Sequence, residues 1–422
     1  MLDSPKSCPT NVPPYFHVMA KPAGSRCNFD CQYCFFLSKS NFYPESSFQM
    51  EEDVLEAYIM ESQRSDEVTI ALQGGEPTLM GFKFFEKSIE LVRKYLRPGN
   101  APNFTIQTNG SLLDKDWCKF LRNNKFLVGL SMDGPRELYD AYRRDKGGSP
   151  TFKRVMRAAR LMQQYHVDFN ILCTVHAANV RYPLEVYQFF RDVVKTHFIQ
   201  FIPIVERVTP ELLDIANKDW GERQDRPLYI QQGDMVTDRS VDPDMWGQFL
   251  IAIFDEWVRR DVGNVFVQTF ESALAWLPAS LCIFAPTCGD GLALEHNGDL
   301  YSCDHFVEPS YFLGNILQTP MIEMVAGDKQ RKFGRDKRDT LPWHCRQCRY
   351  LFACNGECPK NRFIKTSDGD SGLNYLCSGY RAFYSHAEQN MRTMADLLRK
   401  GQNADGIMKI LDNKEARSKA KA

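Results

Sequence analysis

The chain has 422 residues, of which 43% are apolar and 25% are charged, and this ordinary globular composition excludes a collagen-like, disordered or coiled-coil protein. Lys and Arg number 52 against 53 Asp and Glu, so the net charge of -1 predicts no nucleic acid and no anionic membrane as a partner. No apolar run reaches the ~18 residues that a membrane-spanning helix needs, and the N-terminus lacks the apolar stretch of a signal peptide. We therefore expect a cytoplasmic protein of about two or three domains.

Short apolar runs alternate with amphipathic segments over residues 15–208. The runs rich in Val, Ile and Phe predict strands at 15–21, 68–73, 104–108, 127–132, 169–175 and 198–205. The helical spacing of apolar residues predicts helices at 51–64, 82–96, 115–123, 152–165 and 183–194. Repeated βα units predict an α/β fold with a parallel sheet. Their strict alternation favours a partial (β/α)6 barrel of the TIM type, with a doubly wound sheet as the alternative.

The rest of the chain changes in composition from segment to segment. Residues 209–244 are charged and irregular, 245–260 predict one amphipathic helix, and most of the cysteines follow. The predicted division is an N-terminal extension at 1–14, a barrel at 15–208, a linker with a helical segment at 209–280, a Cys-rich domain at 281–381, and a C-terminal helix with a basic tail at 382–422.

Eleven of the 14 cysteines gather in two regions. In a reducing cytoplasm, clustered thiols are more often metal ligands than disulfides. Cys27, Cys31 and Cys34, called here the first-loop cysteines, have the spacing CxxxCxxC shortly after the first predicted strand. Three thiolates can hold a [4Fe–4S] cluster with one iron left open for a substrate or cofactor. The alternatives are a zinc site that lacks one ligand and buried structural cysteines.

Eight further cysteines supply enough thiolates for two fully ligated [4Fe–4S] clusters. They are Cys282, Cys288, Cys303, Cys345, Cys348, Cys354, Cys358 and Cys377. The alternative is zinc, because the four cysteines between 345 and 358 would also suit a tetrahedral four-thiolate site.

Three polar motifs follow predicted strands, at the edge where barrels hold their active sites. They are QGGEP at 73–77, QTNG at 107–110 and SMDG at 131–134. The two glycines of the first motif let the backbone approach a ligand closely, although the same sequence also suits a plain turn. A hairpin turn at 297–299 presents Asp304 beside Cys303. A carboxylate in that place can act as a general base, and the alternative is a solvated turn residue.

With Tyr33 before the last cysteine of CxxxCxxC and GGEP in a later loop, the chain resembles the radical S-adenosylmethionine (SAM) enzymes. The resemblance implies that the open iron binds SAM, and that one electron from the cluster cleaves SAM to methionine and a 5′-deoxyadenosyl radical. It also implies which residues contact SAM: Tyr33, Gly75, Glu76, Ser131, Arg143 and Val205. Without the resemblance, Arg143 would be read as a solvated charge and Ser131 as a turn residue.

The eight C-terminal cysteines resemble the SPASM extension of peptide-modifying radical SAM enzymes. That resemblance implies two interlocked ligand sets. The first auxiliary set is Cys282, Cys288, Cys303 and Cys358, and the second auxiliary set is Cys345, Cys348, Cys354 and Cys377. With the first-loop cluster, the chain would hold three [4Fe–4S] clusters.

The segments YSCDHF at 301–306 and CNGECPKNR at 354–362 narrow the resemblance to the anaerobic sulfatase-maturating enzymes. The implied reaction oxidises a Cys or Ser of a sulfatase to Cα-formylglycine: the radical takes a hydrogen from Cβ, Asp304 takes the thiol or hydroxyl proton, and an auxiliary cluster takes the electron. Gln73 and Gln107 are expected to contact the substrate. The implied partners are an unfolded or nascent sulfatase with a C/S-x-P/A-x-R motif and a one-electron donor such as flavodoxin or ferredoxin.

Two other functions stay open. Another SPASM peptide modifier, such as a thioether-forming enzyme, is less favoured because many of these carry an N-terminal recognition domain, and few residues precede Cys27. A zinc-stapled interaction scaffold would contain a few zinc ions, against roughly twelve iron atoms per chain for three clusters.

Overall fold

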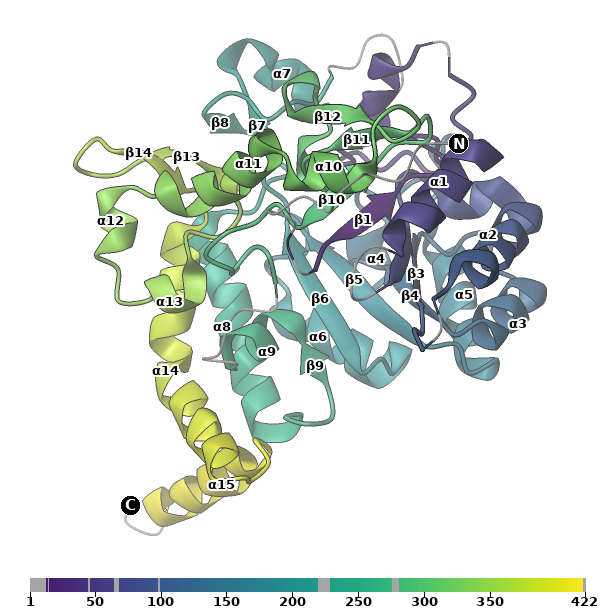
Figure 1. Ribbon diagram of the computed structural model, residues 1–422. Helices are drawn as coiled ribbons and strands as arrows, with labels where there is room; N and C mark the ends of the chain where they lie inside the picture. The colour runs from purple at the N-terminus through teal and green to yellow at the C-terminus, as the bar shows by residue number, and fades with distance from the viewer. Residues whose placement is uncertain are drawn as a thin grey trace.

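The structure is a computed structural model that describes residues 13, 15–44, 46–63, 68–97, 99–218, 228–274 and 281–419. At its centre lies a sheet in which six neighbouring strands run parallel (Figure 1). They are β1 (His17–Ala20), β2 (Thr69–Leu72), β3 (Asn103–Thr108), β4 (Phe126–Ser131), β5 (Phe169–Val175) and β6 (Phe198–Pro203). Each predicted strand is confirmed to within two residues at either end.

The order of these strands decides between the two predicted architectures. They lie side by side in chain order from β1 to β6, and the two edge strands of the sheet, β12 and β9, do not pair with each other in the described part of the chain. A doubly wound sheet would reverse its order at one point, whereas right-handed crossovers that always step the same way place every helix on one face. The fold is therefore an open, partial barrel of the α/β class.

Helices cover the outer face of the barrel (Figure 1). They are α1 (Glu52–Ser62), α2 (Gly81–Tyr95), α3 (Lys115–Asn123), α4 (Arg136–Tyr139), α5 (Phe152–Gln164) and α6 (Pro183–Gln188). Asp114 fixes the start of α3, because its carboxylate accepts hydrogen bonds from two backbone N–H groups of the first turn. The prediction of one α-helix over 183–194 is wrong after Gln188: residues Phe189–Val194 widen into a π-helix, and Lys195 leaves it with a φ of 55°.

The sheet continues beyond the barrel at both edges. On one side β9 (Phe266–Val267) pairs with β6. On the other side β10 (Gly291–Leu294) pairs in parallel with β1, and β11 (Asp299–Tyr301) and β12 (Phe312–Asn315) follow as antiparallel strands. The predicted hairpin around 297–299 is thus confirmed as the β10–β11 turn. Backbone pairing therefore joins the Cys-rich region directly to the first strand of the barrel.

The segment predicted as a linker contains short elements and one long helix. The described part includes β7 (Arg207–Val208), which pairs with β8 (Met235–Val236), then α7 (Leu213–Ala216), α8 (Pro243–Arg260) and α9 (Gln268–Leu274). The predicted amphipathic helix is α8, and Asp242 caps it. Its apolar face is completely buried at Trp246, Phe249, Leu250, Ile253 and Trp257, as the spacing of these residues predicts.

The rest of the C-terminal region consists of short elements and a long helix (Figure 1). They are α10 (Met321–Ala326), α11 (Asp328–Asp339), α12 (Trp343–Arg346), α13 (Leu351–Cys354), β13 (Arg362–Lys365), β14 (Ser371–Asn374), α14 (Cys377–Arg399) and α15 (Gly406–Lys419). Helix α14 packs along α8. A Cβ on Gly379 would lie 2.1 Å from the Pro243 carbonyl, so only glycine permits this approach. None of the described helices is both long and apolar enough to cross a bilayer.

Candidate cofactor and metal sites

The first-loop cysteines lie in the loop that leaves β1. Cys31 is buried, and Cys27 and Cys34 are half-buried. Burial, the nearby Glu76 carboxylate and the thiols of Cys31 and Cys34 all raise the pKa of Cys27. The Cys27 sulfur accepts weak hydrogen bonds from the Phe29 backbone N–H at 3.3 Å and the Asn109 amide at 3.7 Å. The three thiols thus share one small, partly dry region, and they would have to lose their protons to bind a metal.

The GGEP loop after β2 packs directly on this cysteine loop. Gly75 donates its N–H to the Gly24 carbonyl and Glu76 donates to that of Arg26. A Cβ on Gly75 would lie 2.0 Å from the Arg26 carbonyl oxygen, so no other residue fits there. Position 74 also requires glycine, because its φ of +119° is a backbone conformation that other residues rarely adopt. The glycines therefore bring two backbones into contact and fix the shape of the cysteine loop.

Glu76 uses its side chain to hold the same loops together. The carboxylate has no exposed surface and accepts hydrogen bonds from the backbone and hydroxyl of Thr78, the hydroxyl of Thr108 and the backbone of Asn109. These bonds tie the end of β2 to the end of β3. Any contact of Glu76 with SAM would therefore come from its backbone.

Asp133, which the sequence analysis did not single out, organises the neighbouring part of the site. Its fully buried carboxylate accepts hydrogen bonds from the Tyr33 hydroxyl, from Arg143 Nε at 2.7 Å and Nη2 at 3.1 Å, and from the Thr174 backbone at 3.0 Å. Burial alone would raise the pKa of Asp133, but the charge of Arg143 and the contact with His176 lower it well below its usual range. Arg143 is thus a buried ion-pair partner and not a solvated charge.

Gln107 and Ser131 meet at the ends of β3 and β4, where Gln107 Nε2 donates a 2.8 Å hydrogen bond to Ser131 Oγ. Gln107 leans over Gly129, where a Cβ would lie 2.0 Å from its Oε1 atom. Gln73 lies apart from this pair, since its amide points to the sulfur of Met19 in β1. Val205 is buried after β6, and its carbonyl accepts the hydroxyl of Tyr229.

Asp304 reaches the barrel from the far end of the chain. It lies in the short 3-10 turn that follows Cys303, and it forms an ion pair with Lys21, the first residue after β1. Lys21 is almost fully buried, whereas the Asp304 side chain keeps 21% of its surface exposed. Burial would raise the pKa of Asp304, but the charges of Lys21 and Lys360 lower it. Burial lowers the pKa of His305 to about 3. Asp304 is therefore a partly exposed carboxylate beside a neutral histidine.

The eight C-terminal thiols fall into two electrostatic groups. Burial raises the pKa values of Cys303, Cys358 and Cys288; in addition, the thiol of Cys358 raises the pKa of Cys303, and the thiol of Cys282 raises the pKa values of all three. Separately, the interacting thiols in the second group are Cys345, Cys348, Cys354 and Cys377. This grouping has the same members as the interlocked sets that the resemblance implies.

Each group contains four thiols, which is the number of protein ligands that a fully ligated [4Fe–4S] cluster takes. The residues present therefore fit iron–sulfur clusters.

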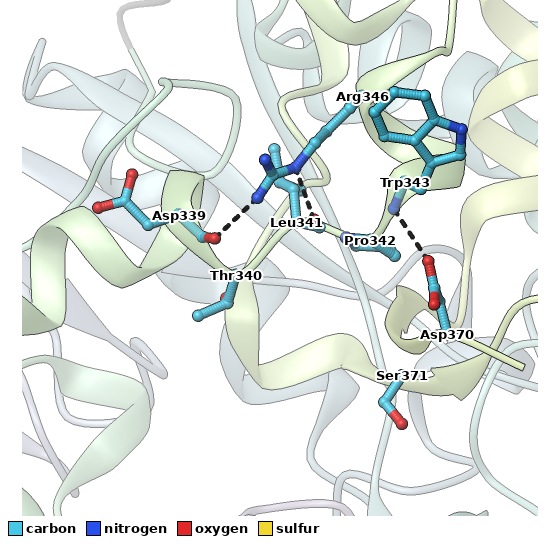
Figure 2. A pocket seen from close by; sticks show the side chains of 8 residues that line it. All are labelled: Asp339, Thr340, Leu341, Pro342, Trp343, Arg346, Asp370 and Ser371. Carbon is cyan, nitrogen blue, oxygen red and sulfur yellow. Dashed lines mark hydrogen bonds between the residues drawn. The ribbon is translucent and has the colours of Figure 1, made fainter.

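A surface pocket lies beside the second auxiliary set (Figure 2). It is lined by Asp339, Thr340, Leu341, Pro342, Trp343, Arg346, Asp370 and Ser371. Arg346 donates to the backbone carbonyls of Leu341 and Asp339, and the backbone N–H of Trp343 donates to the Asp370 carboxylate. These bonds hold α12, which carries Cys345, and they leave the Trp343 indole 63% exposed. Cys345 itself is buried beneath this pocket wall and does not line it.

Family models and relatives agree with this geometry. The Radical SAM superfamily model matches residues 22–190, and the SPASM iron–sulfur cluster-binding domain matches residues 282–349. The chain is 43% identical to a serine-type anaerobic sulfatase-maturating enzyme from Bacteroides thetaiotaomicron, over 94% of this chain and 95% of that one. It is 34% identical to a cysteine-type anaerobic sulfatase-maturating enzyme from Clostridium perfringens, over 91% and 99%.

A solved structure described as native anSMEcpe with bound AdoMet (SAM) and a Cp18Cys peptide superimposes with a TM-score of 0.76. It is 33% identical to this chain, and the match covers 90% of this chain and 99% of that one. The two domain matches imply iron–sulfur clusters and SAM as cofactors. The chain belongs to the anaerobic sulfatase-maturating enzymes, which are radical SAM enzymes with a SPASM domain.

Proposed function

We propose that this enzyme oxidises a Cys or Ser side chain of a sulfatase to Cα-formylglycine, with Asp304 as the proton acceptor. The observation that carries the proposal is the Lys21–Asp304 ion pair, which places a partly exposed carboxylate where β1 leads into the cysteine loop. The serine-type and cysteine-type relatives support the same activity. A thioether-forming reaction has no comparable support from these relatives.

The reaction needs three losses from the substrate residue. It loses a hydrogen atom from Cβ, a proton from its sulfur or oxygen, and one electron, which an auxiliary cluster would accept; together these losses amount to a two-electron oxidation. SAM held at the first cluster would supply the hydrogen-abstracting radical. Asp304 accepts the proton, and Lys21 holds the carboxylate in its ionised form until it does so. Serine then yields the aldehyde directly, and cysteine yields it after water replaces sulfide.

The cofactor contacts follow from the same geometry. We propose that the first-loop cysteines would hold a cluster whose open iron position lies next to Tyr33, Ser131 and Arg143. Gly75 and the backbone of Glu76 would lie on one side of SAM and Val205 on the other. Asp133 supports this set, because it holds the Tyr33 hydroxyl and the Arg143 guanidinium in fixed positions. The Gln107–Ser131 hydrogen bond links a proposed peptide contact to a proposed SAM contact.

Three [4Fe–4S] clusters complete the proposal, one at each group of thiols. The electrostatic grouping supports the assignment of Cys358 to the first auxiliary set, although Cys354, four residues earlier, belongs to the second. Gln73 is the weaker of the two proposed peptide contacts, since its amide points to Met19.

The proposed partners are a peptide segment of an unfolded or nascent sulfatase, carrying C/S-x-P/A-x-R, and an electron donor such as flavodoxin or ferredoxin. The peptide held by the solved relative supports the first. We also propose that the enzyme works in the cytoplasm, because the cysteines that the structure describes form no disulfide, as is usual in a reducing compartment. The domain limits predicted from the sequence remain part of the proposal.

The test is an anaerobic assay with the reduced, reconstituted enzyme, SAM, and two peptides that differ only in C-x-P-x-R or S-x-P-x-R. The proposal expects an aldehyde product with at least one peptide and 5′-deoxyadenosine in proportion to it. In Asp304→Asn, formylglycine should fall by about 10²–10⁴-fold, while SAM cleavage continues. Unchanged formylglycine would remove Asp304 from the reaction, and equal loss of both products would assign it a structural role beside Cys303.

A further inference from the structure

The turn between Cys354 and Cys358 has an unusual backbone. Its three inner residues all have positive φ: 45° at Asn355, 70° at Gly356 and 54° at Glu357. Left-handed conformations cost about 1–2 kcal/mol for each non-glycine residue, so three in a row require support from their surroundings. The turn also has a special place, because Cys354 belongs to the second auxiliary set and Cys358 to the first. It is the covalent link between the two proposed clusters.

Arg362, at the start of β13, supplies that support. Its guanidinium donates to the carbonyl of Asn355 at 2.6 Å, of Gly356 at 2.8 Å and of Glu357 at 3.1 Å, and a further N–H donates to the carbonyl of Lys337. A Cβ on Gly356 would lie 2.6 Å from Arg362 Nη2, so the glycine makes room for the guanidinium. In the described part of the chain, its hydrogen bonds all go to uncharged backbone carbonyls.

The positive charge of Arg362 lies close to both sets. Two of the carbonyls that it binds belong to neighbours of proposed ligands: Asn355 follows Cys354 of the second set, and Glu357 precedes Cys358 of the first. The buried Glu357 carboxylate lies in the same turn, where it accepts hydrogen bonds from the side-chain amides of Asn361 and Asn374. The guanidinium therefore lies within electrostatic reach of both proposed clusters.

We propose that Arg362 is a positioning residue shared by the two auxiliary clusters: its hydrogen bonds fix the turn between them, and its charge makes both easier to reduce. The reduction potential of an iron–sulfur cluster depends on nearby charge and on solvent exposure. A fixed cation in a partly dry region favours the more negative, reduced state of each cluster. This inference rests on the proposed function, because it requires the two auxiliary clusters.

Lys337 provides a matched comparison on the same structure. It is almost fully buried in α11, and its ammonium donates to the backbone carbonyls of Cys282 and Ile283. Cys282 is a proposed ligand of the first auxiliary set, so the ammonium group lies beside that set. Lys337 is therefore a second buried cation that should act on one cluster only.

The test is a redox titration followed by electron paramagnetic resonance. It uses the full chain with the first-loop cysteines changed to Ala, so that only the auxiliary clusters give signals. Arg362→Gln should lower the midpoint potentials of both clusters, and Lys337→Gln should lower only one, which thereby identifies the first auxiliary cluster. Arg362→Lys keeps the charge and should keep both potentials close to those of the parent.

Each outcome decides a separate point. If the parent protein lacks two auxiliary signals, the proposed function fails before Arg362 is tested. If both potentials stay unchanged in Arg362→Gln, or if only one shifts, the shared role is wrong. If Arg362→Gln loses its iron, the result for Arg362→Lys is decisive. Clusters retained in Arg362→Lys, with the potentials of the parent, support the role of the charge, whereas equal loss of iron in both variants overturns that role.

Discussion

Replacing Asp133 by Asn should destabilise the protein far more than an ordinary loss of one charge. Asp133 has no exposed surface and receives four hydrogen bonds, two of them from Arg143, whose side chain is only 8% exposed. Asparagine keeps the shape but presents an NH2 group to these donors and leaves the guanidinium without a counter-charge. Removing one partner of a buried ion pair costs about 3–5 kcal/mol.

The size of this effect can be read from urea unfolding. For urea slopes of up to about 3 kcal/mol per molar, a loss of about 3–5 kcal/mol lowers the midpoint by about 1 M or more. Asp168→Asn is the matched control, because the Asp168 side chain is 75% exposed and lies 3.7 Å from that of Arg122, which is 53% exposed. Exposed pairs contribute about 0–1 kcal/mol, so the control should shift the midpoint by a few tenths of a molar.

A double variant separates the ion pair from other effects. Asp133→Asn combined with Arg143→Gln removes the unpaired buried charge, so its midpoint should lie above that of Asp133→Asn alone. The reasoning is refuted if Asp133→Asn behaves like Asp168→Asn, or if the double variant shows the sum of the two single losses. In either case Asp133 would not be the anchor of Arg143.

Three further predictions concern stability and iron content. Gly129→Ala forces the Gln107 side chain out of its place, so we expect a loss of about 1–3 kcal/mol and weaker SAM binding by calorimetry, whereas Gly147→Ala, with only ordinary contacts, should match the parent. Changing the first-loop cysteines to Ala should abolish 5′-deoxyadenosine formation and lower the iron content from roughly twelve to roughly eight atoms per chain. Cys118→Ala is the control: Cys118 is buried in α3 and lies far in sequence from the proposed ligands, so its replacement should leave the iron content unchanged. Burial lowers the pKa of Lys39 from 10.5 to about 8, so the unfolded chain binds this proton more tightly than the folded chain does. The free energy of unfolding of the parent, relative to that of Lys39→Met, should therefore rise between pH 8 and pH 10.5 and stay constant below pH 8.

The regular elements were predictable because their information is local. A buried strand such as β5 and an amphipathic helix such as α3 have the bounds that the apolar pattern predicts. The π-helix after Gln188 was missed because it has the same apolar spacing as the α-helix before it. The pairing of β10 with β1 was also missed, since it joins short segments hundreds of residues apart and no local pattern reports it.

The site was predictable in its residue types and less so in its contacts. Asp133 stood in a motif that the sequence analysis noted, and an acidic residue at the end of a buried strand was a usable signal. Its role became visible only when Tyr33 and Arg143 met it in space. The Cys358 assignment came from resemblance; the Asn-Gly pair at 355–356, which suits positive φ, was the local sign of the tight turn that separates it from Cys354.

The sheet explains how residues from two distant segments come to share one site. Because β10 pairs in parallel with β1, with Ala20 opposite Leu294, Lys21 leaves the sheet at the edge where the β10–β11 hairpin turns. Strand β11 then leads to Cys303, and Asp304 meets Lys21. Backbone hydrogen bonds, and not a flexible contact between two domains, therefore set the position of the proposed base relative to the first-loop cysteines. An exchange of the Cys-rich region between relatives must preserve this strand register, since a shift of one residue would turn alternate side chains to the other face and separate Asp304 from its lysine.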